Sequence, residues 1–209
     1  MPRAGLSRAS VVGLALSVVD DGGVRGFETL TLAAVAARAG VAVPSLYKHV
    51  ESLADLRREV AVIAVRGLTA DLEKATSGAT GSEAIVRLAH AVREHARTQP
   101  GRYSAAQVAP DAEEPADAPL RAVAAGAARV VAAALAASGI LGPDLGGGEP
   151  LSGTELVHTV RVVRAAVHGF VTLEAGRGFG LPDDIDESFD HLVTTLVRGL
   201  QRAAAVEAG

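Results

Sequence analysis

Apolar residues recur at helical spacing along most of the chain, and short polar or glycine-rich segments separate these periodic stretches. The expected helices cover about 7–20, 32–39, 43–50, 53–74, 81–99, 120–137, 154–175 and 185–205. Pro100 and Gly101 are expected to end the fifth of them. A loop dense in glycine is expected at 138–153. The fold class that follows is all-α.

Residues suited to capping mark the ends of the early helices. Ser7, Thr31 and Ser52 each precede a periodic stretch, where an N-cap side chain accepts a backbone N–H. Gly40 follows the helix over 32–39, and a helix often ends on a glycine in the left-handed conformation. Pro44 then opens a short helix, because the fixed φ of proline suits a first turn. Two short helices joined by a tight glycine turn form the helix-turn-helix pattern.

The two sides of the short helix differ in chemistry. One side is apolar and can dock on a core. The other side presents a cation, an imidazole and hydroxyl groups: Pro44, Ser45, Lys48 and His49, with Tyr47 on a flank. In the major groove of DNA, Lys48 and Ser45 can reach base edges or phosphates, whereas Tyr47 and His49 can donate to phosphate oxygens. From the spacing alone, an ordinary helical hairpin with a solvated polar face fits about as well.

Composition and charge narrow the function classes. The chain has no cysteine, which excludes disulfides, thiolate metal sites and cysteine nucleophiles. The net charge is −4, yet residues 1–50 hold five Lys or Arg against three acids, which is compatible with a small binding head on an acidic body. The N-terminus has no signal-peptide core, and no uncharged apolar stretch approaches the roughly 18 residues of a membrane span. We therefore expect a soluble cytoplasmic protein that does not enter a membrane.

The segment TLAAVAARAGVAVPSLYKHVESLADL, residues 31–56, resembles the DNA-binding motif of the TetR family of bacterial transcription regulators. The resemblance rests on the helix led by Thr31, the Ala-Gly-Val turn at 39–41 and the short helix that closes on Leu46, Tyr47 and His49. Residues 164–193 are similar to the subgroup named for a Trp-His-Gly signature: His168 and Gly169 match, but the chain contains no tryptophan.

The resemblance implies an all-α homodimer with an N-terminal helix-turn-helix head and a C-terminal helical bundle that dimerises. The expected divisions are a DNA-binding domain over 1–52, a connecting helix over 53–75, and a ligand-binding and dimerisation domain over 76–209. The expected partners are a palindromic double-stranded DNA operator, a small-molecule effector and a second copy of the chain, and the expected activity is repression. The predicted DNA-binding residues are Thr31, Val43, Pro44, Ser45, Tyr47, Lys48 and His49.

The C-terminal half offers candidates for a ligand pocket and a dimer interface. A helical body rich in Ala, Val and Leu can hold an apolar cavity, and Arg164 could anchor an anionic group there. The pocket candidates are Tyr103, Arg164, His168, Phe170 and Phe179. An apolar stripe on the last helix predicts the dimer interface, with plain core packing as the alternative. Its members are Phe189, Leu192, Val193, Leu196 and Leu200.

Catalytic and metal chemistry find little support in the pattern. His90 and His95 lie five residues apart on one expected helix and share a face poorly. Residues 139–150 are rich in glycine, but no strand precedes them and no lysine follows, so they do not form a phosphate-binding loop. We expect no enzyme activity, no cofactor and no metal. The alternative is a helical enzyme or a partner-binding bundle, for which no convergent nucleophile, base and orienting group is visible.

Overall fold

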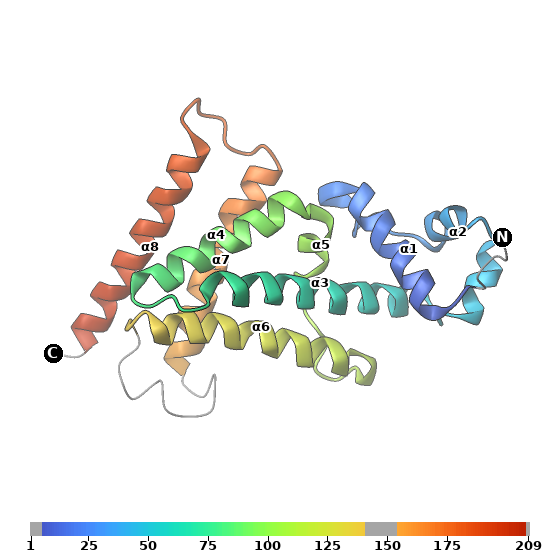
Figure 1. The fold of residues 1–209 in the computed structure, drawn as a ribbon, viewed down its shortest axis with the longest axis horizontal. Helices are drawn as coiled ribbons and strands as arrows, with labels where there is room; N and C mark the ends of the chain where they lie inside the picture. The colour runs from blue at the N-terminus through green and yellow to red at the C-terminus, as the bar shows by residue number, and fades with distance from the viewer. Residues whose placement is uncertain (1–5, 141–153, 208–209) are drawn as a thin grey trace. The chain divides into compact units, whose positions relative to one another are not determined.

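The computed structural model describes residues 6–140 and 154–207, and every regular element in that part of the chain is helical. The predicted all-α class is therefore confirmed. The predicted loop over 138–153 lies mostly outside the described residues. The elements are α1 Arg8–Asp21, the 3₁₀ turn η1 Gly23–Arg25, α2 Leu32–Ala39, the 3₁₀ helix η2 Val43–Lys48, α3 Leu53–Thr76, α4 Ser82–Thr98, α5 Pro100–Ala105, η3 Pro115–Asp117, α6 Ala118–Ala137, α7 Thr154–Ala175 and α8 Ile185–Glu207 (Figure 1).

The predicted caps form the hydrogen bonds expected of them. The hydroxyl groups of Ser7 and Thr31 each accept a backbone N–H three residues later, at 3.1 Å in both cases. The hydroxyl of Ser52 accepts the N–H of Asp55 at 3.0 Å. Gly40 takes the left-handed conformation with φ of 67°. These helix ends are therefore set by local interactions, which is why the sequence predicts them.

Contacts divide the chain into two compact units, the first formed by 1–68 with 98–124 and the second by 69–97 with 125–209. The functional domains predicted from the sequence, with boundaries at 52 and 75, are a separate division of the chain and stay a prediction. The core of the first unit gathers side chains from α1, α2, η2, α3 and α5. Its buried members are Val11, Val12, Ala15, Val19, Leu30, Val35, Ala36, Leu46, Val50, Leu56, Val60, Ala64 and Ala105.

Residues 98–105 depart from the prediction that Pro100 and Gly101 simply end a helix. The helix α4 does stop at Thr98, but Pro100 begins the further helix α5. An added Cβ at Gly101 would lie 2.3 Å from the carbonyl oxygen of Val19, so this glycine lets α5 approach the end of α1. The reason for Gly101 is close packing, which no local pattern reveals.

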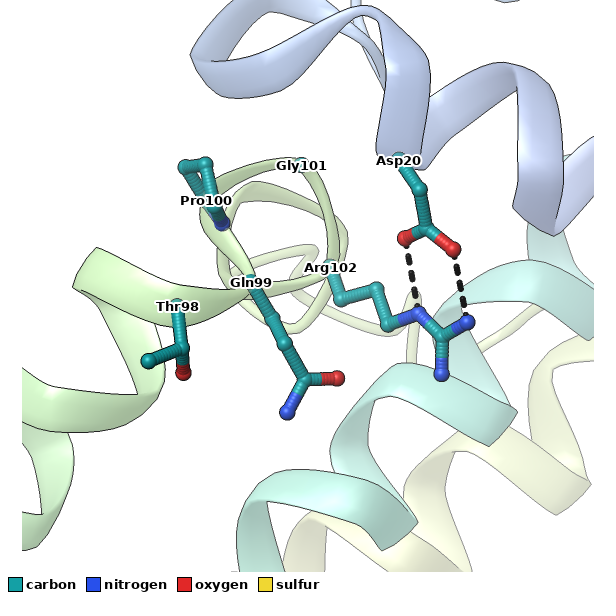
Figure 2. Close-up of a pocket in the computed structure, with 6 residues that line it drawn as sticks. All are labelled: Asp20, Thr98, Gln99, Pro100, Gly101 and Arg102. Carbon is teal, nitrogen blue, oxygen red and sulfur yellow. Dashed lines mark hydrogen bonds and ion pairs between the residues drawn. The ribbon is translucent and has the colours of Figure 1, made fainter.

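An ion pair fixes α5 on α1 within the first unit. Arg102 donates two hydrogen bonds to the carboxylate of Asp20, at 2.8 and 2.7 Å (Figure 2). Hydrogen bonding to Asp20 raises the pKa of Arg102, so the guanidinium stays charged. The pair borders a cavity of about 250 Å³ that is also lined by residues 98–101. Bidentate geometry of this kind holds two backbone segments in one register.

The second unit is held together by a buried arginine. The side chain of Arg93 on α4 is 7% exposed and donates to both carboxylate oxygens of Glu174 on α7, at 2.8 and 2.6 Å. It also donates to Asp186 on α8 at 2.6 Å, and its guanidinium lies 4.8 Å from the ring centroid of Phe189. Hydrogen bonding to Glu174 raises the pKa of Arg93. One side chain thus joins three helices.

Among the residues that the structure describes, two segments are long and apolar enough to cross a membrane by length and composition alone. They are Pro115–Ala137 and α7, with mean hydropathies of 1.6 and 1.2. These segments were not identified from the sequence, because only uncharged apolar runs were considered there. Both contain arginines, which interrupt such a run. The core helix of a soluble protein passes the same test, so these two helices are weak support for a membrane location.

Candidate nucleic-acid interface

The backbone of the helix-turn-helix is set by the turn between α2 and η2. The N–H groups of Gly40 and Val41 donate to the carbonyls of Ala37 and Ala36, at 3.2 and 3.1 Å, which closes the end of α2. Leu46 and Val50 are then buried in the core of the first unit. This docking leaves the opposite side of η2 free to face a partner. The segment is a 3₁₀ helix, and the sequence predicted only that it is helical.

The predicted DNA-binding residues differ in their exposure to solvent. Tyr47 is 56% exposed, and Pro44 and Lys48 are also exposed. Ser45 and His49 are half-buried at the edge of the same face. A large aromatic side chain with this much exposure next to an exposed lysine is suited to contact an anionic surface.

Thr31 and Val43, also predicted to contact DNA, have structural roles in the first unit. The hydroxyl of Thr31 accepts the N–H of Ala34 as the cap of α2. Val43 is half-buried and packs against the core cluster. Both remain candidate DNA contacts through their exposed atoms.

Arg57 on α3 supports the interface, although the sequence analysis did not single it out. Its guanidinium donates to the carbonyl oxygens of Glu28 and Leu30, at 2.8 and 3.2 Å, and lies 5.7 Å from the ring centroid of Phe27. These contacts hold the segment that leads into α2. Because its partners lie 27 to 29 residues away, no local signal could have identified it.

The pocket candidates fall into both units. Tyr103 lies on α5 in the first unit, whereas the other four lie in the second. Phe170 packs on Phe179 with ring centroids 4.6 Å apart. His168 is half-buried, and burial, followed by the charge of Arg164, lowers its pKa, so the ring is neutral at pH 7. The four residues of the second unit thus place two rings and a neutral imidazole on α7 and the segment after it.

The candidate dimer residues also separate into two groups. Phe189 and Val193 are 0% and 2% exposed, so they pack inside the second unit. Leu192, Leu196 and Leu200 are half-buried, one helical turn apart on α8. The sequence stripe combined the two groups because it cannot tell a core face from its edge.

Two histidines of α4 lie beside carboxylates of the second unit. His95 Nδ1 lies 2.6 Å from a carboxylate oxygen of Asp71, and His90 Nε2 lies 3.2 Å from one of Asp190. Within residues 6–140 and 154–207, no group of three or more His, Asp or Glu side chains could hold a metal ion.

A helical head with a core-docked helix-turn-helix and an exposed, polar second helix defines a DNA-binding regulatory protein. Residues 23–60 match the family described as bacterial regulatory proteins, tetR family. Residues 85–196 match a second family description, the tetracyclin repressor-like C-terminal domain. The chain belongs to the tetR family, and its predicted function as a DNA-binding transcriptional regulator is confirmed.

Two relatives span nearly the whole chain. The uncharacterized HTH-type transcriptional regulator Rv0681 of Mycobacterium tuberculosis is 35% identical over 94% of this chain and 83% of its own length. The uncharacterized HTH-type transcriptional regulator YobS of Bacillus subtilis is 31% identical over 95% of each chain. A solved structure of a protein with unknown function from Rhodococcus sp. RHA1 superposes with a TM-score of 0.71 at 23% identity, covering 96% of this chain and 99% of that one. The last similarity concerns the fold alone.

Proposed function

We propose that this protein is a cytoplasmic, ligand-responsive repressor that binds a palindromic operator as a homodimer and carries out no catalysis. The observation that carries the proposal is the exposed polar face of η2, with Tyr47 and Lys48 projecting from a backbone docked on the core. We assign DNA binding to 1–52, the connecting helix to 53–75, and effector binding and dimerisation to 76–209. The two matched family descriptions, one toward each end of the chain, support this division.

In this proposal η2 lies in the major groove. Lys48 and Ser45 contact base edges or phosphates, and the hydroxyl of Tyr47 donates to a phosphate oxygen, which sets the register. The imidazole of His49 lies next to them, and Pro44 starts the helix. Leu53 stands where many family members carry a phosphate-contacting lysine, so that contact is not expected here.

Substituting the exposed residues of η2 is expected to weaken operator binding without affecting the fold. Lys48→Ala removes one phosphate neutralisation and lowers the magnitude of the log–log salt slope by about 0.9. Tyr47→Phe removes only the hydroxyl donor. Fluorescence anisotropy with a duplex operator at several salt concentrations measures both effects. Arg87→Ala on α4 serves as the control, because it removes the same charge from the second unit. Unchanged affinity in both η2 variants would show that another element reads DNA.

Dimerisation is proposed to use α7 and α8, which pack on each other in the second unit. Leu192, Leu196 and Leu200 form the apolar edge on α8, and α7 adds Val162 and Leu173, which are 48% and 51% exposed. A head of this size reads one half-site, and specific binding requires two heads spaced about 34–36 Å apart. A two-fold pairing of these helices supplies the second head and covers the exposed apolar side chains.

Light scattering at micromolar concentration is expected to give the mass of a dimer, and Leu196→Glu is expected to give mostly monomer. A carboxylate placed in an apolar interface is costly unless it finds a partner. Val24→Glu is the control, because Val24 is exposed on the first unit. A monomeric parent protein that still binds a two-half-site operator would contradict the proposal.

The effector is proposed to be a small, largely apolar molecule that binds the second unit and lowers DNA affinity. Phe170 and Phe179 would contact its apolar part, and His168 and Arg164 would orient a polar or anionic group. We propose that the chain is a member of the Trp-His-Gly subgroup, which the match of His168 and Gly169 supports. By linkage, such an effector binds the DNA-bound dimer more weakly than the free dimer.

A further inference from the structure

Arg8, the first residue of α1, reaches the carboxyl end of the recognition segment η2. Its Nη1 donates to the carbonyl oxygen of His49 at 3.1 Å. Its Nε donates to Glu59 at 2.7 Å, and its Nη2 donates to Asp55, also at 2.7 Å. A single guanidinium therefore joins three separate segments of the first unit: the start of α1, the end of η2 and the first two turns of α3.

The partners of Arg8 hold the rest of the short connection between η2 and α3. Asp55 also accepts the backbone N–H of Glu51 at 3.1 Å, and Ser52 caps α3 through the N–H of Asp55. Hydrogen bonding from Arg8 lowers the pKa of Asp55, and the two carboxylates raise that of Arg8. Arg8 and Asp55 therefore stay charged at neutral pH, and residues 49–52 are held by polar contacts at both ends.

The recognition segment needs such a partner because it is short. A 3₁₀ helix of six residues has poor hydrogen-bond geometry and is marginal without outside contacts. Pro44 fixes its first turn, but the last carbonyl groups of any helix have no partner inside the helix. Arg8 supplies that partner for His49, directly after the exposed residues Tyr47 and Lys48.

We propose that Arg8 is a positioning residue for DNA reading, which acts by holding the carbonyl of His49 and not by contacting a phosphate. The inference rests on the proposed role of η2 as the DNA reader. The alternative role is a direct phosphate contact, because the side chain of Arg8 is 44% exposed. Its donors, however, are already directed at two carboxylates and one carbonyl oxygen.

Arg8→Lys separates the two roles, because lysine keeps the charge and loses the planar fork that bonds three partners at once. The operator is first selected from a random duplex library with the parent protein. Positioning predicts that Arg8→Lys loses at least about tenfold in operator affinity, the scale of one charged hydrogen bond. It also predicts unchanged affinity for an unrelated duplex and an unchanged salt slope. A phosphate contact predicts operator affinity close to that of the parent.

Glu59→Ala is a second test, because the two roles of Arg8 predict opposite changes in operator affinity. Removing a carboxylate from a DNA-binding unit ordinarily strengthens binding to phosphates. If Glu59 holds Arg8 on His49, its loss weakens operator binding instead. Glu51→Ala is the matched control, since Glu51 is exposed and joins the cluster through its backbone N–H; its operator affinity is expected not to fall.

The results separate failure of this inference from failure of the proposed function. Higher operator affinity in Glu59→Ala, or parental affinity in Arg8→Lys, would overturn the positioning role. Equal losses on operator and unrelated DNA would do the same, because they indicate lost charge or lost fold. Circular dichroism melts of each variant establish that the head is folded at the assay temperature. If the parent protein enriches no sequence from the library, the proposed DNA-reading function fails first.

Discussion

Phe189→Ala is expected to lower the free energy of unfolding by about 3–5 kcal/mol, the usual cost of deleting a buried aromatic ring. Phe189 is fully buried in the second unit. Its ring centroid lies 5.0 Å from that of Phe170 and 5.2 Å from that of His90, and the guanidinium of Arg93 lies over its face. Truncation therefore leaves a cavity and also removes the aromatic surface beneath a buried charge.

Urea unfolding followed by circular dichroism measures this loss. Phe179→Ala is the matched control, because Phe179 packs on the same cluster but is only half-buried, so its loss is expected to be clearly smaller. The comparison also bears on dimerisation. If Phe189 contributed mainly to an interface between copies, its substitution would change the dimer dissociation constant and leave the unfolding of the monomer nearly unaltered.

Gly26→Ala is expected to destabilise the first unit by about 3 kcal/mol or more, at the upper end of what overpacking costs. A Cβ on Gly26 would lie 1.9 Å from the carbonyl oxygen of Val19, and one on Gly101 would lie 2.3 Å from the same atom. The obstacle is backbone at the end of α1, which cannot move aside as a flexible side chain can. Either substitution must displace the turn before α2 or the helix α5.

Gly13→Ala is expected to change the stability of the first unit in the opposite direction. Gly13 lies inside α1, and an added Cβ there would meet nothing within 4 Å. Alanine is favoured over glycine in a helix interior by roughly 0.5–1 kcal/mol, so this variant should be more stable than the parent. Chemical denaturation of the three glycine variants measures the order. If Gly26→Ala were as stable as Gly13→Ala, the close approach to Val19 would not exist in solution.

The candidate DNA-binding site could be predicted because its signals are local. Thr31, Gly40 and Pro44 act on backbone within about one helical turn of themselves, and the structure shows the cap, the left-handed turn and the short helix where the pattern places them. The apolar side of η2 likewise follows from its own spacing, with Leu46 and Val50 buried. Secondary structure and amphipathic faces of this kind depend on neighbouring residues alone.

The candidate residues in the C-terminal half were less well predicted, because the role of each depends on which other helix packs against it. One apolar stripe on α8 predicted a dimer interface, yet Phe189 and Val193 are buried within the second unit, which leaves Leu192, Leu196 and Leu200 for that role. Periodicity shows that a face is apolar and does not show what covers it. Tyr103 was grouped with residues of α7, but it belongs to the first unit through α5.

The amino-acid pattern was sufficient for the capped helix ends and the all-α class, because capping, proline geometry and helical periodicity act over a few residues. The family followed from the resemblance of residues 31–56 to a known motif. The supporting contacts required the folded chain. Arg8 binds His49 across 41 residues and Arg93 binds Asp186 across 93, while Gly26 and Gly101 are needed only because separate backbone segments meet at Val19. The sequence around an arginine or a glycine does not show which distant residue it will contact. Only the packing of the folded chain determines which arginine pairs with which carbonyl or carboxylate, and which glycine lies against another backbone segment.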